Sequence, residues 1–209
     1  MGSGRDGTNV NGTRPQRVTR PGQAARLSLL LVGLGLLAMA GSSVTADTPR
    51  ASVHDVKAAF LFKFIKYVTW PENPGEIPSR PFVIGVFGDD SIHEAVDAIA
   101  AQLAGTRPFE IRHYDDPVDL DTCQILFVGR SRRYRSADVL ARVPASGTLT
   151  VGDARDFITA GGAIGLAVMD NRVRFEVNLA ATRAADLHIS SKLLRLAVKV
   201  EGAEAGELN

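Results

Sequence analysis

Apolar residues in the segment 53–70 recur at steps of three and four residues, which is the spacing of one face of an α-helix. Ser52 can cap the start of this helix. Pro71 disfavours helical backbone in the residue before it, so we expect the helix to end near Trp70. Lysines interrupt the segment at intervals too short for any part of it to cross a bilayer. The segment is therefore predicted to be a helix of the folded domain.

Downstream, continuous apolar runs alternate with amphipathic segments. The run FVIGVFG, residues 82–88, is uninterrupted, which is typical of a strand buried on both faces. Asp170-Asn171 is a two-residue hairpin turn signal. The pattern predicts an α/β fold: a single three-layer domain with a mostly parallel sheet, helices on both faces and a C-terminal antiparallel hairpin. The expected strands are 82–88, 108–114, 124–129, 148–153 and two around 170–171, and the expected helices are 91–103, 136–142, 179–186 and 190–200.

The N-terminus has the pattern of an export signal. An arginine-rich polar run precedes the apolar run 27–40, which is shorter than the roughly 20 residues of a membrane-spanning helix. Small residues follow at positions suited to cleavage after Ala46, with Ala40 as the alternative. We interpret residues 1–46 as a cleaved signal peptide and residues 47–209 as the exported domain. An uncleaved signal anchor is the alternative interpretation.

Net charge and cysteine content limit the possible partners and the possible disulfide bonds of the exported domain. Without residues 1–46 the formal net charge falls from +1 to −3, because that segment holds five of the 24 basic residues and one of the 23 acidic ones. A mildly acidic exported domain argues against nucleic acid as a partner. Cys123 is the only cysteine, so an internal disulfide is excluded, and a buried thiol or an intermolecular bridge remains.

The expected strand ends carry no complete catalytic motif. Dinucleotide-binding, Walker, nucleophile-elbow and His-Glu-x-x-His patterns are all missing from the sequence, and the four histidines lack metal-ligand spacing. Asp153 and Asp156 are interpreted as helix-capping residues rather than an acid/base pair. A dense positive patch at 130–135 could hold an anion or an acidic partner loop, or be a solvated turn. The sequence therefore predicts no catalytic residue, metal site or cofactor.

Two groups of residues are candidates for binding. The aromatic surface of the first helix is broader than a one-sided helix requires, so part of it is a candidate surface for a partner protein, and packing inside the domain is the alternative. Alternation along the strand 172–178 places its polar residues on one face, where they form a small-ligand surface or an internal lattice of ion pairs. The partner-binding candidates are Phe60, Phe64, Tyr67 and Trp70, and the ligand-binding candidates are Gly161, Gly162, Arg174, Glu176 and Asn178.

Four stretches of the chain, in order and spacing, carry a family resemblance. They are VKAAFLFKFIKYVTWPE, ILFVGRS, LTVGDARDFITAGGAIGLAVMDNRVRFEVNLAA and LHISSKLLRLA. Together they resemble the YfiR family of exported bacterial proteins over essentially all of residues 53–199. The most specific parts are the Trp70-Pro71 step, the Gly161-Gly162 pair, the strand 174–178 and the Ser190-Ser191 step.

The resemblance implies a non-enzymatic periplasmic protein that binds the periplasmic domain of an inner-membrane diguanylate cyclase and holds it inactive. Cyclic-di-GMP signalling and biofilm formation would then fall. It also implies dimers held by disulfides, and here the chain departs from the family, because Cys123 has no internal partner. Another membrane receptor, such as a histidine kinase, is the alternative partner. A periplasmic module that binds a peptidoglycan fragment or an amino acid is the alternative function.

Overall fold

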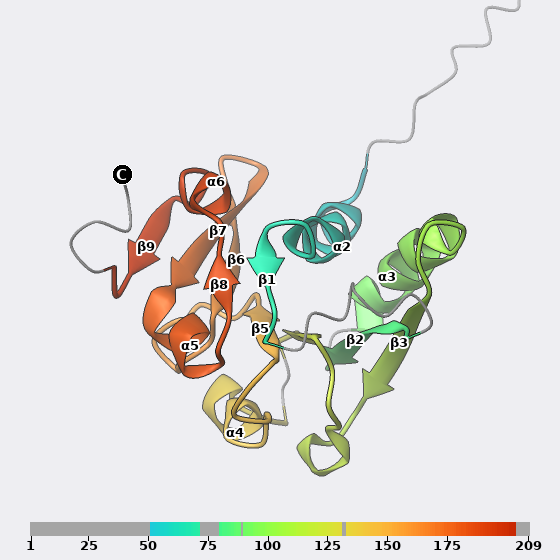
Figure 1. Cartoon of the computed structure of the whole chain (residues 1–209), viewed down its shortest axis with the longest axis horizontal. Coiled ribbons are helices and arrows are strands. Elements are labelled where there is room, and N and C mark those ends of the chain that lie inside the picture. The colour runs from blue at the N-terminus through green and yellow to red at the C-terminus, as the bar shows by residue number, and fades with distance from the viewer. Residues whose placement is uncertain (1–50, 72–79, 89, 131–132, 204–209) are drawn as a thin grey trace, which may run out of the picture. The chain divides into compact units, whose positions relative to one another are not determined.

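The computed structural model describes residues 51–71, 80–88, 90–130 and 133–203 (Figure 1). The expected signal peptide, residues 1–46, lies outside these residues. Within the described part of the chain, no helix combines the length and the apolar character needed to cross a membrane.

A seven-stranded sheet in the order β3-β2-β4-β5-β6-β7-β9 forms the centre of the domain. In this order, the neighbouring strands β3, β2, β4, β5 and β6 are all parallel to one another. Strands β6 and β7 form an antiparallel hairpin, and β9 lies parallel to β7. The α/β fold with a mostly parallel sheet and a late hairpin is thus confirmed. The strands are β2 (Phe82–Phe87), β3 (Phe109–Tyr114), β4 (Ile125–Val128), β5 (Leu149–Gly152), β6 (Ile164–Met169), β7 (Arg172–Asn178) and β9 (Lys199–Glu201).

Alternate residues of the central strands pack into two apolar layers. Ile84 points toward α2 (Val53–Phe64) and α3 (Asp90–Leu103), which lie against one another in Figure 1. Phe87, on the opposite face of β2, packs with Val139 of α4 (Ser136–Leu140) and with Phe157. Both faces of the strand are covered, which explains why its sequence is continuously apolar.

The first helix is shorter than predicted, because α2 ends at Phe64 rather than near Trp70. The next residues form the short strand β1 (Val68–Thr69), which pairs antiparallel with β8 (His188–Ile189). Extended backbone points Val68 and Trp70 to the same side, and both are buried. A helix through this stretch would place these two side chains on different faces, so packing against β8 overrides the local helical pattern.

The predicted helix 190–200 is also wrong. Only α6 (Ser191–Leu194) is helical, and the chain then straightens into β9. The backbone N–H of Val198 donates to the carbonyl of Phe175, and β9 continues this pairing along β7. Pairing satisfies backbone groups at the edge of β7, a gain that local periodicity does not reveal. The helix expected at 179–186 is present as α5 (Leu179–Ala184), and a short 3-10 turn, η2 (Pro117–Asp119), lies in the acidic loop.

Candidate functional site

A groove between α2, β7 and α6 joins segments that are far apart in the sequence. Its volume is about 430 Å³, and we call it the α2–β7 groove. Its floor is mostly apolar, and its charged lining residues are all basic. The lining residues are Phe60, Lys63, Phe64, Lys66, Tyr67, Val173, Arg174, Phe175, Leu193 and Leu196.

The expected partner-binding aromatics separate into surface and core residues. Phe60 and Tyr67 are half-buried and line the groove, whereas Phe64 also borders it but is fully buried. The ring centroids of Phe60 and Phe64 lie 5.7 and 5.6 Å from that of Phe175, so the three rings form one apolar wall. Trp70 lies outside this groove. Phe60 and Tyr67 are therefore the members of the group with area left for a partner.

Trp70 is a core residue in this structure. Its side chain is 6% exposed, and its indole N–H donates to the backbone carbonyl of Gln124 at 3.0 Å. Its ring meets that of Phe82 edge-on, with centroids 5.2 Å apart. The side chain therefore links the segment after α2 to the sheet.

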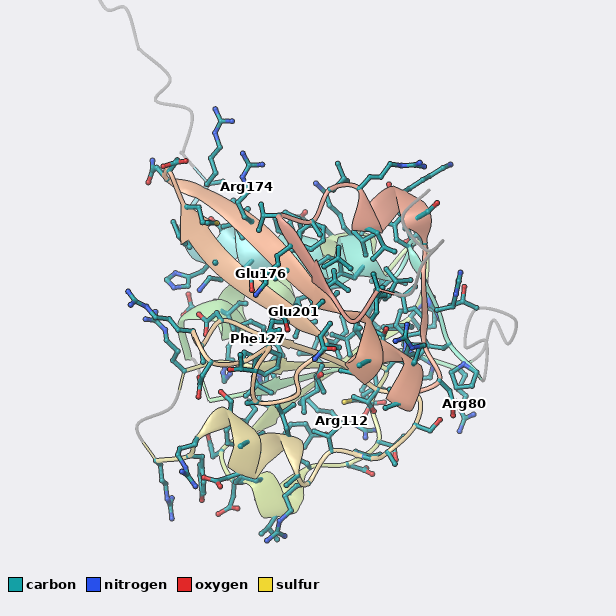
Figure 2. All side chains as sticks on the ribbon, turned by 90° about the vertical axis from the view of Figure 1, so that its left-hand side faces the viewer. Arg80, Arg112, Phe127, Arg174, Glu176 and Glu201 are labelled. Carbon is teal, nitrogen blue, oxygen red and sulfur yellow. The ribbon has the colours of Figure 1, made fainter. Side chains whose placement is uncertain are left out.

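The expected ligand-binding residues do not form one site. Arg174 lines the α2–β7 groove, whereas Glu176 lines a different cavity, and Figure 2 shows Arg174 closer to the hairpin turn than Glu176. The side chain of Asn178 accepts from the N–H of Ala181 and caps α5. Alternation along β7 is as predicted, since Phe175 and Val177 are buried on the face opposite these polar residues.

The Gly161-Gly162 pair shapes a turn. Gly161 has a φ of +99°, which residues with a side chain rarely adopt. A Cβ atom at Gly162 would overlap the ring of Phe157, which is fully buried. These glycines let the chain fold closely around Phe157 before β6 begins, and neither lines the cavity that contains Glu176.

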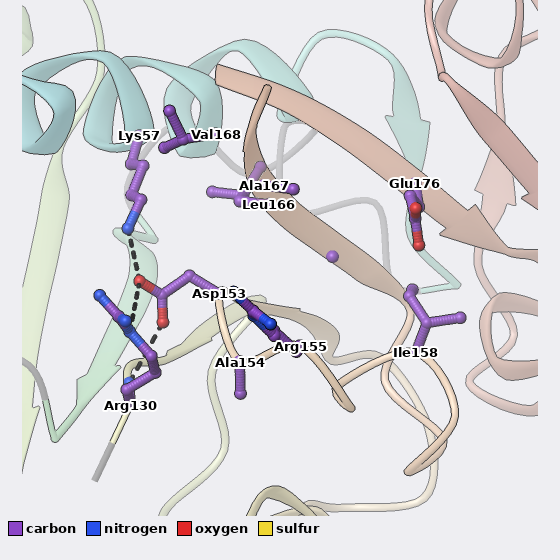
Figure 3. Close-up of a pocket in the computed structure, with 11 residues that line it drawn as sticks. Lys57, Arg130, Asp153, Ala154, Arg155, Ile158, Leu166, Ala167, Val168 and Glu176 are labelled. Atoms are coloured by element: carbon purple, nitrogen blue, oxygen red, sulfur yellow. Dashed lines mark hydrogen bonds and ion pairs between the residues drawn. The ribbon is translucent and has the colours of Figure 1, made fainter. Parts of the chain in front are cut away.

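A second cavity, of about 440 Å³, lies where β4 and β5 end (Figure 3). We call it the strand-end cavity. In sheets of this kind, ligands commonly bind outside the carboxyl ends of the parallel strands. The lining residues are Lys57, Arg130, Asp153, Ala154, Arg155, Ile158, Gly165, Leu166, Ala167, Val168 and Glu176.

A buried ion pair forms one end of this cavity. Lys57 of α2 donates to the carboxylate of Asp153, and the two side chains are only 6% and 2% exposed. Asp153 also accepts from the backbone N–H of Arg130 at 3.2 Å, and the Nε of Arg130 lies 3.8 Å away. The interpretation of Asp153 as a helix cap was wrong, because its carboxylate instead forms the ion pair with the ammonium group of Lys57. The two residues are 96 positions apart, so no local pattern could reveal the pair.

Cys123 is buried, at 2% exposure, and burial raises the pKa of its thiol to about 12. The predicted buried thiol is thus confirmed. Because the thiolate is the reactive form, we expect Cys123 of the folded protein to resist a thiol reagent at pH 8 and to react readily in denaturant. Mass measurement of the labelled fraction checks this, and rapid labelling of the folded protein would contradict it.

Among the described residues, no three His, Cys, Asp or Glu side chains gather closely enough to hold a metal ion.

Residues 54–198 match the family model described as YfiR/HmsC-like. The chain belongs to the YfiR/HmsC-like family. This is a family of periplasmic, regulatory proteins. Comparison with curated proteins gives no match.

Among solved structures, a conserved domain protein from Vibrio cholerae O1 biovar El Tor strain N16961 is similar to this YfiR/HmsC-like chain, with a TM-score of 0.52 and 8% sequence identity. The likeness covers 72% of this chain and 60% of that one. At this identity the comparison supports the α/β fold alone.

Proposed function

We propose that this YfiR/HmsC-like protein is a non-enzymatic periplasmic regulator that binds the periplasmic domain of an inner-membrane diguanylate cyclase, or of a related sensor, and represses it. Lower cyclic-di-GMP signalling and less biofilm would follow. The observation that supports this proposal is the α2–β7 groove, which combines three of the four aromatics expected to bind a partner with a cationic rim.

The groove suits a partner segment that is apolar in the middle and acidic at its edges. Phe60 and Tyr67 offer half-buried aromatic surface, and aromatic residues are enriched in the cores of protein interfaces. Lys63, Lys66 and Arg174 line the groove beside this surface, and none of its lining residues within the described chain is acidic. Such a rim favours acidic partners and disfavours basic ones.

Apolar surface continues beyond the groove toward the C-terminal part of the chain. Leu196 is 65% exposed and lines the groove, and Val198 is 47% exposed two residues further on. Both follow α6, next to the point where β9 joins β7. A partner that covers the groove would therefore also remove these side chains from water.

The proposal is tested by capture from the cell envelope. The full chain is expressed with an affinity tag in the native cells, and the membrane proteins that co-purify with it are identified by mass. Recovery of a diguanylate cyclase or sensor kinase supports the proposal, and cyclic-di-GMP is then measured in cells with and without the protein. Recovery of no membrane protein contradicts it.

Variants in the groove make the test specific. We expect Leu196→Asp and Arg174→Glu each to reduce recovery of the partner at least about tenfold, because one places a charge in the apolar surface and the other reverses the rim charge. Val118→Asp is the control, since Val118 is 70% exposed and lies on η2, away from the groove. Melting temperatures check that all three variants fold. Equal recovery with all of them would exclude the groove as the interface.

A small-ligand module is the second candidate function. The strand-end cavity supports it, because its volume falls in the range of small-molecule sites, roughly 300–1,000 Å³, and it contains unpaired charges. The two functions use different hollows and are compatible in one protein.

A further inference from the structure

The strand-end cavity contains an open backbone edge of β6. The ladder between β5 and β6 consists of Val151 beside Ile164 and Gly152 beside Gly165. Strand β6 then continues to Met169, paired with β7 alone. Its other edge, from Leu166 to Val168, has no neighbouring strand in the described chain and lines the cavity.

The hairpin geometry determines which backbone groups face this edge. Asp170 and Asn171 have φ values of 48° and 57°, as a two-residue turn of type I′ requires, so Met169 and Arg172 form the first hydrogen-bonded pair. The N–H of Asn178 donates to the carbonyl of Ala163 at 2.9 Å, which fits the same alternation.

It follows that Leu166 and Val168 direct their backbone groups away from β7 and toward the cavity. Within the described chain, no backbone hydrogen bond reaches the carbonyl of Leu166 or either backbone group of Val168. Exposed groups of this kind pair readily with an added strand.

Opposite charges lie at the two ends of the cavity. Figure 3 shows the Lys57–Asp153–Arg130 cluster at one end and Glu176 at the other, with Arg155 between them. Lys57 already neutralises Asp153, so the guanidinium of Arg130, whose side chain is 72% exposed, is available to another anion. Arg155 is exposed and makes no ion pair with the described residues.

Glu176 is the unpaired anion of the cavity. It makes no ion pair within the described part of the chain, because Lys199, its neighbour on β9, binds Glu201 instead. The side chain is half-buried, and Gly165 lies opposite it on β6, where the side chain of Ile158 packs against the glycine. The cavity thus offers guanidinium groups for an anion and a carboxylate for a cation.

We propose that the strand-end cavity binds a short peptide of two or three residues with free termini. The peptide lies extended along Leu166–Val168, with its carboxylate at Arg130 and Arg155 and its amino group toward Glu176. Three residues of extended chain span about 10 Å, which matches the open edge. None of the described residues that line the cavity is aromatic, so they offer no stacking surface for a nucleobase or an aromatic ring.

The test uses purified full-chain protein and calorimetric titration with trialanine, C-amidated trialanine and N-acetylated trialanine. We expect trialanine to bind saturably, with a dissociation constant on the order of 1 mM or tighter. Amidation removes the carboxylate and acetylation removes the amino charge, so each should weaken binding about tenfold. Failure of trialanine to bind the folded protein would overturn the proposal, as would equal affinity for the three peptides.

Two variants assign the ends of the peptide. In Arg155→Gln the ratio of the dissociation constants of C-amidated trialanine and trialanine should shrink severalfold. In Glu176→Gln the corresponding ratio for N-acetylated trialanine and trialanine should shrink severalfold. Arg195→Gln and Glu94→Gln are matched controls, because both residues are exposed and outside the cavity. If the controls behave like the cavity variants, the site is refuted.

The proposal does not depend on the partner groove. Neither Arg155 nor Glu176 lines that groove, so peptide binding and capture of a membrane partner fail or succeed separately. Inorganic phosphate is titrated in parallel. If phosphate binds tightly, Glu176→Gln leaves that binding unchanged and trialanine does not bind, the cavity is a simple anion site. That result would contradict the proposal that it binds a peptide.

Discussion

Trp70→Ala is expected to lower the free energy of unfolding by about 3–5 kcal/mol, which is the usual cost of truncating a large buried aromatic residue. The substitution leaves a cavity beside Phe82 and removes the donor to the carbonyl of Gln124, which lies 3.0 Å away. It also loosens β1, because Trp70 directly follows that strand. Chemical denaturation monitored by circular dichroism measures the change.

Trp70→Phe is the matched control. It keeps most of the apolar area but loses the indole N–H, so we expect a cost of about 1–2 kcal/mol. Capture of the membrane partner should persist in this variant, since Trp70 lies outside the α2–β7 groove. A Trp70→Ala variant of unchanged stability that no longer binds its partner would show instead that the indole is an interface residue.

Asp153→Ala is expected to cost about 3–5 kcal/mol, because it leaves the ammonium group of Lys57 buried without its partner. The effect should persist at high salt, since buried charges are poorly screened. The double variant Lys57→Met/Asp153→Leu should recover most of the loss, because replacing a buried pair with apolar residues is often nearly neutral. Thermal or urea unfolding of the single and double variants measures these differences.

A neighbouring carboxylate provides the control. Asp156 is exposed three residues from Asp153, so Asp156→Ala should change stability by no more than about 0.5 kcal/mol. If Asp153→Ala also changes the free energy of unfolding by no more than about 0.5 kcal/mol, the ion pair between α2 and the end of β5 contributes little to stability. A double variant less stable than either single variant would also contradict the expectation.

The aromatic segment 57–70 contributes both to the fold and to the candidate partner surface. Buried members of the segment hold α2 and β1 on the sheet, and half-buried members remain at the surface. Lys57 and Phe60 lie about one turn apart on α2, yet one closes the strand-end cavity and the other lines the groove. Alanine variants of this segment therefore need a stability measurement before any loss of binding is interpreted.

The sequence by itself determined the fold class, because the continuous apolar runs of β2 and β4 and the turn at Asp170-Asn171 act locally and agree with one another. It also determined that Phe175 and Val177 face the core. The family followed from the same local motifs, since their order and spacing extend over most of the chain.

Only the tertiary structure decided which polar and aromatic residues meet. Nothing local distinguishes Phe60, which remains half-buried, from Trp70, which packs on Phe82. The pairing of Lys57 with Asp153 and the separation of Arg174 from Glu176 depend on where strands end and which neighbours they find. The reason is physical: periodicity reports which face of an element is apolar, whereas a site is formed by contacts between elements that are distant in the sequence.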